Sequence, residues 1–304
     1  MNIWEKAYKG SLDADALAMP VHWYYDRQAL RREYGTVDHY MAPRSPHSGS
    51  ILYRSKYKPR NARGDILGDQ AQYWGKPGIH YHQFLQAGEN TLNFKLAQLL
   101  YKDVTAHQSY DPDRWLELYV EFMLNPAGHR DTYVEEYHRA FFSNYARGKK
   151  PRECGIVDEH IGGLATVPAL AAALADRPLE ELLETVRLHV SLTHRHDGVL
   201  HAADTLIRML AQVASGVELP KAIMTEMGGK HTKLQSLLGE DDLWVIGQHY
   251  SPACYIDDAF PAALYLALKY HDNYAAGLTA NAMAGGDNCH RGAVVGALLG
   301  ATKG

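Results

Sequence analysis

Four short polar clusters in the sequence carry side chains that can transfer protons, bind sugar hydroxyls or ligate a metal ion. Each lies at the edge of a segment with helical periodicity, and helix ends that converge on one cleft form sites in all-α proteins. The clusters are Asp13 with Asp15, residues 89–93, residues 158–160 and residues 287–290. We expect the segments around Asn93 and Asp287 to meet in space as opposing walls of one polar hollow.

The cluster at 287–290 combines a carboxylate, an amide, a thiol and an imidazole. Two glycines precede it, so Asp287 or Asn288 can cap the following helix by accepting its free backbone N–H groups. Asp287 can serve only as this cap, or it can bind a ligand that the glycines allow to approach the backbone. Cys289 can be a packed thiol or a reactive one. His290 can be a structural residue, a metal ligand or an acid–base group, and as a sequence neighbour of Cys289 it points about 100° away from it on a helix.

The other clusters supply carboxylates and imidazoles that have both structural and chemical interpretations. Asp15 lies near the C-terminal end of an expected helix, where a carboxylate opposes the helix dipole and so either has a partner or is simply solvated. Glu89 is a candidate proton donor, and His82 shares one side of an extended segment with a second histidine. Asp158 and His160 are further candidates for substrate binding or proton transfer.

The elements that must position these clusters are helices. Apolar residues recur with helical period along most of the chain, and convincing alternating strand segments are absent, so we expect an all-α fold. Between residues 41 and 88 the pattern gives way to prolines, glycines, tyrosines and a basic run, which indicates a long ordered loop region. We expect a single domain over residues 1–304. The predicted helices cover 3–17, 92–100, 115–124, 133–145, 156–175, 179–192, 199–213, 233–238, 258–270, 274–283 and a last stretch reaching 303.

Composition excludes several classes of function. The formal net charge of −4 argues against nucleic-acid binding by bulk charge, and the basic run near residue 60 either contacts phosphate or is solvated. There is no apolar run long enough to cross a membrane. The first residues lack the layout of a secretory signal, and three scattered cysteines indicate a reducing, cytoplasmic setting.

Several motifs occur in an order known from one enzyme family. Residues 10–20 contain Gly and then Asp-Ala-Leu-Ala-Met-Pro, residues 87–94 read Ala-Gly-Glu-Asn-Thr-Leu-Asn-Phe, and residues 260–264 read Phe-Pro-Ala-Ala-Leu. Residues 285–290 read Gly-Gly-Asp-Asn-Cys-His and are followed by a helix with glycines at 292, 296 and 300. In these motifs the chain resembles the ADP-ribosylglycohydrolase family, whose members remove ADP-ribose from modified proteins. The resemblance implies an all-α, orthogonal helical globule.

The resemblance also implies a metal site, because the family holds two magnesium ions with a Thr-Asp-Asp and an Asp-x-Asp-Thr motif. At the matching positions this chain keeps only Thr91 and Asp287; the others are Leu92, Asn93, Cys289 and His290. Magnesium prefers carboxylate oxygens, so the changes argue against a two-magnesium site. The chain then holds no metal, or one softer ion on Asp287, His290 and Cys289. In the family, a glutamate just after the N-terminal motif serves the active site. The matching place in this chain is near His22, so this residue differs from the family as well.

We expect a hydrolase that cleaves an N- or O-glycosidic bond at a ribose or ADP-ribose moiety, with Asp287, His290 and Glu89 as catalytic groups. The alternative is an inactive protein that binds ADP-ribose or a nucleotide. The partner is a small-molecule or protein-linked ribosyl substrate, with no nucleic acid and no membrane; cofactor and oligomeric state stay open. The expected substrate-binding residues are Thr91, Asn93, Asn90, Asn288, Cys289, Asp15, His82, Asp158 and His160.

Overall fold

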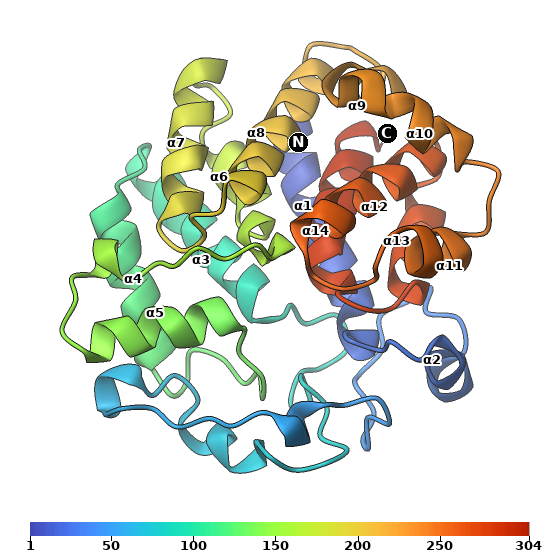
Figure 1. Ribbon diagram of the computed structural model, residues 1–304. Coiled ribbons are helices and arrows are strands. Elements are labelled where there is room, and N and C mark those ends of the chain that lie inside the picture. The colour runs from blue at the N-terminus through green and yellow to red at the C-terminus, as the bar shows by residue number, and fades with distance from the viewer. Residues whose placement is uncertain (304) are drawn as a thin grey trace.

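The computed structural model describes residues 1–303, and every regular element in this range is helical (Figure 1), which confirms the predicted all-α class. Isolated backbone bridges occur, but the described residues form no strand. None of the helices in the described part is long and apolar enough to cross a membrane. The α-helices are α1 Ile3–Ala18, α2 Arg27–Tyr34, α3 Leu92–His107, α4 Pro112–Leu124, α5 Glu136–Ala146, α6 Val167–Ala173, α7 Leu179–Ser191, α8 Asp197–Ala214, α9 Leu219–Met227, α10 His231–Ser236, α11 Asp242–Trp244, α12 Ile256–Lys269, α13 Tyr274–Met283 and α14 Asn288–Thr302.

Helix α14 runs through the middle of the molecule and is buried from Asn288 to Ala301. The first helix, α1, lies beside it (Figure 1), and the glycines of the two helices meet. A Cβ added to Gly296 would lie 2.1 Å from the carbonyl oxygen of Gly10, so neither position accepts a side chain without a backbone shift. Because glycine lacks a side chain, the two helices approach closely along their length and place the start of α14 next to the end of α1.

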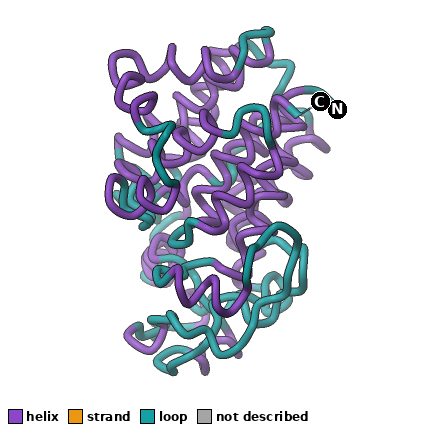
Figure 2. The backbone as a smooth tube through the Cα atoms, turned by 90° about the vertical axis from the view of Figure 1, so that its right-hand side faces the viewer, coloured by secondary structure: helices purple, strands orange, loops and turns teal. Residues whose placement is uncertain are grey.

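The loop region predicted for 41–88 contains no α-helix and only three short 3-10 turns, Leu52–Arg54, Ala62–Gly64 and Gly68–Tyr73. In the side view it gathers at one end of the molecule, below the helices (Figure 2). A small cluster of Trp23, Leu52 and Tyr81 anchors it. The region therefore adds an ordered wall to one side of the helical body.

One predicted helix was wrong. Residues 156–160 are extended, because Ile156 N donates to Thr193 O (3.2 Å) and Ile256 N donates to Glu159 O (2.9 Å). After a 3-10 turn at Ile161–Leu164, only Val167–Ala173 is α-helical. The two glycines at 162 and 163 explain the break, since glycine is a poor helix former. The prediction also omitted α2 and α9.

Candidate active site

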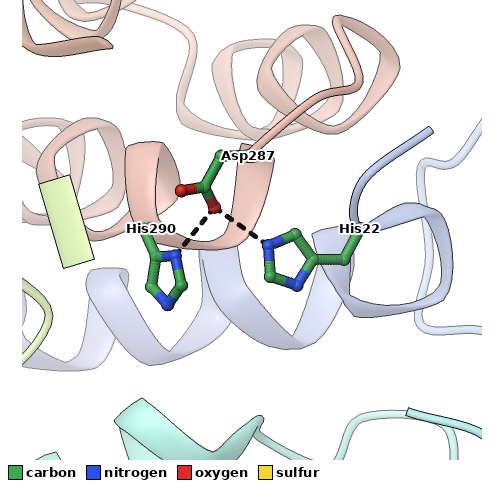
Figure 3. Close-up of side chains that lie close together, drawn as sticks. All are labelled: His22, Asp287 and His290. Carbon is green, nitrogen blue, oxygen red and sulfur yellow. Dashed lines mark hydrogen bonds and ion pairs between the residues drawn. The ribbon is translucent and has the colours of Figure 1, made fainter. Parts of the chain in front are cut away.

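Two histidines converge on one carboxylate where α1 and α14 meet. His22 Nε2 lies 2.9 Å from Asp287 Oδ1, and His290 Nδ1 lies 2.8 Å from the same oxygen (Figure 3). His22 follows the short 3-10 turn Met19–Val21 that ends α1, whereas His290 sits in the first turn of α14. Each side chain of the trio is about 1% exposed. Asp287 occupies the N-cap position of α14, but its carboxylate makes no cap hydrogen bond and faces the imidazoles instead.

The backbone around this trio is held in an unusual conformation. Trp23 N donates to Gly286 O and Gly286 N donates to Tyr24 O, both at 2.8 Å, which fixes His22 beside Asp287. Gly285 and Gly286 have φ of 66° and 64°, and a Cβ on Gly285 would lie 2.2 Å from Tyr24 O. Trp23 itself has φ of 60°, which is uncommon for a bulky residue and is typical of strain at functional sites.

A second carboxylate, that of Asp131, is linked to His22 through His82. His22 Nδ1 lies 2.8 Å from His82 Nε2, and His82 Nδ1 lies 2.5 Å from Asp131 Oδ1. His82 lowers the pKa of Asp131, which overcomes the effect of burial, and the two histidines nearest Asp287 lower the pKa of that carboxyl strongly. Both carboxylates are therefore ionised and each accepts a ring proton.

The second ring nitrogen of His290, Nε2, contacts the side chain of Asn93. The side-chain amide of Asn93, in the first turn of α3, bridges His290 Nε2 (2.5 Å) to the Tyr137 hydroxyl (2.6 Å) and to His138 Nε2 (2.8 Å). Asn93 and Asp287 thus lie on opposite sides of His290. The two segments therefore meet in space, but Asn93 lies behind His290 and is not among the residues that line the cleft.

Glu135 supplies a third carboxyl group at the N-cap position of α5. Its Oε1 lies 3.5 Å from His290 Nε2, and its Oε2 is buried with no hydrogen-bond partner among the described residues. Burial raises the pKa of Glu135, although His290 opposes the shift. Burial lowers the pKa of His290, but Asp287 more than reverses this and raises it to about 9. The site therefore pairs an ionised Asp287 with a carboxyl group that tends to keep its proton.

An aromatic cleft opens above these groups and encloses about 800 Å³, including the solvent at its mouth. Its floor contains Asp287, His290 and Glu135, and its rim includes His160 and Cys254. Trp23 packs edge-on against Tyr133, with ring centroids 4.7 Å apart. The aromatic lining residues are Trp23, Tyr25, Tyr81, Tyr133 and Tyr137.

Several predicted site residues lie in this region. Asp287, His290 and Asn93 are in mutual contact through His290, and His82 contacts the trio through His22. His160 lines the cleft and its Nδ1 lies 2.9 Å from Asp158 Oδ1, so Asp158 reaches the cleft only through His160.

Other predicted residues connect helices instead. Asp15 Oδ2 accepts hydrogen bonds from Thr91 N (2.8 Å) and Asn90 Nδ2 (2.9 Å), and the Thr91 hydroxyl donates to Asp15 Oδ1 (2.7 Å). These three residues join α1 to the start of α3 and do not line the cleft. Asn288 donates to Val21 O (3.2 Å) and Ala282 O (2.9 Å).

Glu89 and Cys289 lie away from the cleft. Glu89 accepts from Lys95 Nζ (2.6 Å) and from Gln86 N (2.9 Å), and its side chain is 37% exposed. Cys289 is buried against α1, with its Sγ 3.7 Å from Asp15 O, and burial raises the pKa of its thiol. The trio around the Asp287 oxygen contains His22 in place of Cys289.

Sequence reasoning missed Glu135, Asp131 and the cleft tyrosines. Residues 133–145 were predicted as one helix, yet α5 begins at Glu136, which leaves Tyr133 and Glu135 in the preceding turn facing the cleft. The available signal was the dense polar and aromatic run at 133–138, which contains few of the apolar residues that a purely structural helix start would carry.

Comparison with known proteins supports the fold. The sequence profile of the ADP-ribosylglycohydrolase family matches residues 6–304. A solved structure described as an ADP-ribosylglycohydrolase-related protein complex has a TM-score of 0.59 and 17% identity, covering 100% of this chain and 89% of that one. At this identity the likeness shows the fold alone. Comparison with curated protein sequences gives no match. On the family match, which spans nearly the whole chain, the protein belongs to the ADP-ribosylglycohydrolase family.

Proposed function

We propose that the protein is a hydrolase that cleaves a glycosidic bond at the ribose of an ADP-ribosyl substrate. The observation that carries the proposal is the pair of carboxyl groups, Glu135 and Asp287, which lie on either side of His290 at the floor of an aromatic cleft. Their environments shift their pKa values in opposite directions. Such a division is typical of enzymes that use one carboxylic acid and one carboxylate on the same bond.

Glu135 fits the part of the general acid. Its Oε2 makes no hydrogen bond within the described residues, although His138 Nε2 lies 3.5 Å from it, and burial raises the pKa of Glu135, which favours the protonated form that a leaving group requires. In the proposed step Glu135 gives its proton to the leaving nitrogen or oxygen as the bond to the ribose C1′ breaks. A water then adds to C1′ and returns a proton to the Glu135 carboxylate, which restores the starting state.

Asp287 fits the part of the permanent carboxylate. It is held ionised, mainly because His290 and His22 offset the effect of burial. Cleavage at C1′ develops positive charge on the sugar ring, and a fixed negative charge nearby stabilises that state. The hydrogen bonds from the two imidazoles keep the carboxylate in one orientation, which limits reorganisation during the reaction.

The aromatic walls suit a sugar or a purine. Trp23 and Tyr133 present ring faces and edges that pack against the apolar face of a ribose or against a base. The cleft has no lysine or arginine among its lining residues, so its floor suits an uncharged sugar better than a phosphate.

A basic groove lies beside the cleft and suits the diphosphate. Ser55 lines the cleft and its neighbour Lys56 lines the groove, whereas Arg139 lies over the ring of Tyr133, 5.4 Å from its centroid. Arginine and lysine side chains are the usual partners of phosphate oxygens. The cationic residues of the groove are Lys56, Lys58, Arg60, Arg139 and Arg147.

Turnover assays test the proposal directly. The full chain is incubated with peptides ADP-ribosylated on arginine or on serine and with simple nucleosides, in EDTA and with added Mg²⁺ or Zn²⁺, and release of ADP-ribose or ribose is followed by chromatography. We expect release from at least one ADP-ribosyl substrate. Absence of turnover of every ribose glycoside contradicts the proposal; saturable ADP-ribose binding without product would instead indicate an inactive binding protein.

A further inference from the structure

We propose that His22, Asp287 and His290 form a binding site for one divalent transition-metal ion. Each residue offers one donor atom, and the three atoms lie within 4.8 Å of one another. The two N–O distances of 2.9 and 2.8 Å are shorter than the ~3.4 Å between the ligands of a tetrahedral metal with bonds of ~2.1 Å, so the side chains would move apart by about half an ångström to take up an ion. The three donors come from both ends of the chain and meet in the buried interior.

The two-magnesium arrangement of the family does not fit the residues present. Leu92 has no donor atom, the amide of Asn93 already bridges His290 to α5, and the Cys289 thiol faces α1. Asp287 is the one carboxylate left at the family's ligand positions, and magnesium needs a near-octahedral set of oxygens rich in carboxylate charge.

Two imidazoles and one carboxylate suit a different class of metal. Nitrogen donors favour Zn²⁺, Fe²⁺ and related ions over Mg²⁺ and Ca²⁺. Three protein ligands with the remaining positions free are typical of reactive rather than structural sites. Asp287 and His290 line the cleft, so the free positions face the space where a substrate or water would enter.

Groups behind both histidines would orient them as ligands. When His22 binds a metal through Nε2, its Nδ1–H donates to His82 Nε2 at 2.8 Å, and His82 in turn donates to Asp131. When His290 binds through Nδ1, its Nε2–H needs an acceptor; the nearest side chain is the Asn93 amide at 2.5 Å, which would have to present its oxygen, and the Glu135 carboxylate lies farther away at 3.5 Å. Metal-binding histidines ordinarily have such an acceptor on the second nitrogen, and it fixes the tautomer of the ring.

The proposed ion would share Asp287 and His290 with the proposed hydrolase site, but its test does not depend on turnover. Two imidazole nitrogens are directed at the same oxygen of Asp287, and a positive φ at Trp23 brings His22 to that oxygen. Histidines that served only to fill the core would require neither feature. Metal binding is measured without substrate, so absence of turnover leaves this inference standing, and absence of metal leaves the hydrolase proposal standing.

The experiment uses the full chain after treatment with EDTA. Calorimetric titration with ZnCl₂ is expected to show one ion per chain with a Kd in the micromolar range or tighter, and titration with MgCl₂ no saturation below about millimolar concentrations. Cobalt(II) should give visible absorption bands from a nitrogen-containing site. X-ray absorption at the zinc edge of the unaltered protein should count two imidazoles.

Variants locate the site. His22→Gln and Asp287→Asn should weaken zinc binding at least 100-fold, and His82→Gln about 10-fold through the outer partner. His107→Ala, at an exposed histidine on α3, is the matched control and should bind as the unaltered chain does. Circular dichroism checks that each variant is folded. Zinc binding that His22→Gln leaves unchanged, an absorption spectrum without imidazole, or no bound zinc at all would each overturn the inference.

Discussion

In the same cleft, the pKa values of the two carboxyl groups of Glu135 and Asp287 are shifted in opposite directions. Burial raises the pKa of Glu135, and the negative charges of Asp131 and Asp287 add to this shift, whereas the two imidazoles on one oxygen of Asp287 overcome its burial and lower its pKa. His290 contacts both, so it couples them. Removing any one of the three changes the charge that the other two experience.

The first prediction concerns Glu135 as the proposed proton donor. Glu135→Gln keeps the shape of the side chain but removes its acidic proton, so the turnover number for ADP-ribose release should fall by about 10²- to 10⁴-fold while KM changes little. Steady-state kinetics on an ADP-ribosylated peptide measures this. Glu136→Gln is the control, because Glu136 lines the same cleft from the exposed side of α5. Equal losses in both variants would remove Glu135 from the proposed role.

The second prediction concerns His160 at the rim of the cleft. Asp158 and then Cys254 raise the pKa of His160 to about 11. A histidine whose folded-state pKa is raised stabilises the fold fully below its unfolded pKa of about 6.5, and this stabilisation is lost as the pH rises towards the folded value. The free energy of unfolding should therefore decrease between pH 6.5 and 8.5, with about 1–2 kcal/mol of the decrease due to His160.

Urea denaturation across this pH range tests the effect. Other groups titrate there too, His290 among them, so the informative quantity is the difference between the unaltered chain and Asp158→Asn. The variant should show the shallower pH dependence. If both chains lose stability equally, the Asp158–His160 pair does not hold a proton in this range.

The sequence predicted part of this site for a physical reason. Asp287, His290 and Asn93 lie at helix starts within motifs, where local rules of capping and periodicity apply. Glu135 and Asp131 lie in an irregular segment and become functional candidates only through contacts with residues distant along the chain. The partnership of His22 with Asp287 spans 265 residues and depends on the turn at Trp23, which no local pattern encodes.

At the scale of elements, the contact between α1 and α14 fixes the site. The glycines at 292, 296 and 300 recur every four residues on the side of α14 that meets α1, and Gly296 faces Gly10, so the two helices pack closely. The start of α14 carries Asp287 and His290, and the segment after α1 carries His22. A shift of one helix along the other would separate these donors.

The third prediction tests this interface. Gly296→Ala places a Cβ 2.1 Å from Gly10 O and 2.7 Å from the Ala14 side chain, so the helices must separate. The expected loss is at least ~2 kcal/mol in the free energy of unfolding, or roughly 3 °C in Tm, despite the better helix propensity of alanine. Gly239→Ala is the control, because a Cβ there meets nothing within 4 Å. A Gly296 variant as stable as the control would show that the helices can adjust.

The helix prediction was wrong where backbone hydrogen bonds to distant segments replace the hydrogen bonds within a helix. Residues 156–160 have helix-compatible composition, but their backbone groups bond to 193–195 and 254–256. These pairings bring His160 next to Cys254 at the cleft rim. The extended conformation therefore serves the site, and periodicity in one segment cannot show a partner that lies about a hundred residues away.

At the scale of the whole molecule, helices form one side of the cleft and the loop region forms the other. Leu52 and Tyr81 line the cleft from the loop side, and Lys56 leads into the basic groove. The long irregular region was predictable from its prolines and glycines, but its contribution to a binding surface was not, because that depends on how it folds back against α5.

The fourth prediction uses the groove. Replacing both Lys56 and Lys58 with Ala should raise KM for ADP-ribosyl substrates about tenfold and reduce the salt dependence of binding, with little effect on the turnover number or on uncharged nucleosides. Initial rates at several ionic strengths measure this. Lys102→Ala, on the exposed face of α3, is the control. An unchanged KM in the double variant would place the diphosphate elsewhere.

The pairing of the first helix with the last has a consequence for biosynthesis. Contacts such as that between Asp15 and Cys289 join residues 274 positions apart, so α1 leaves the ribosome long before its partner exists. Nascent chains grow at about 5–20 residues per second, which leaves the apolar face of α1 uncovered for many seconds. Until α14 emerges, His22 and the carboxylate it contacts cannot meet, so a polypeptide that stops short of α14 should accumulate as a chaperone client without the cleft.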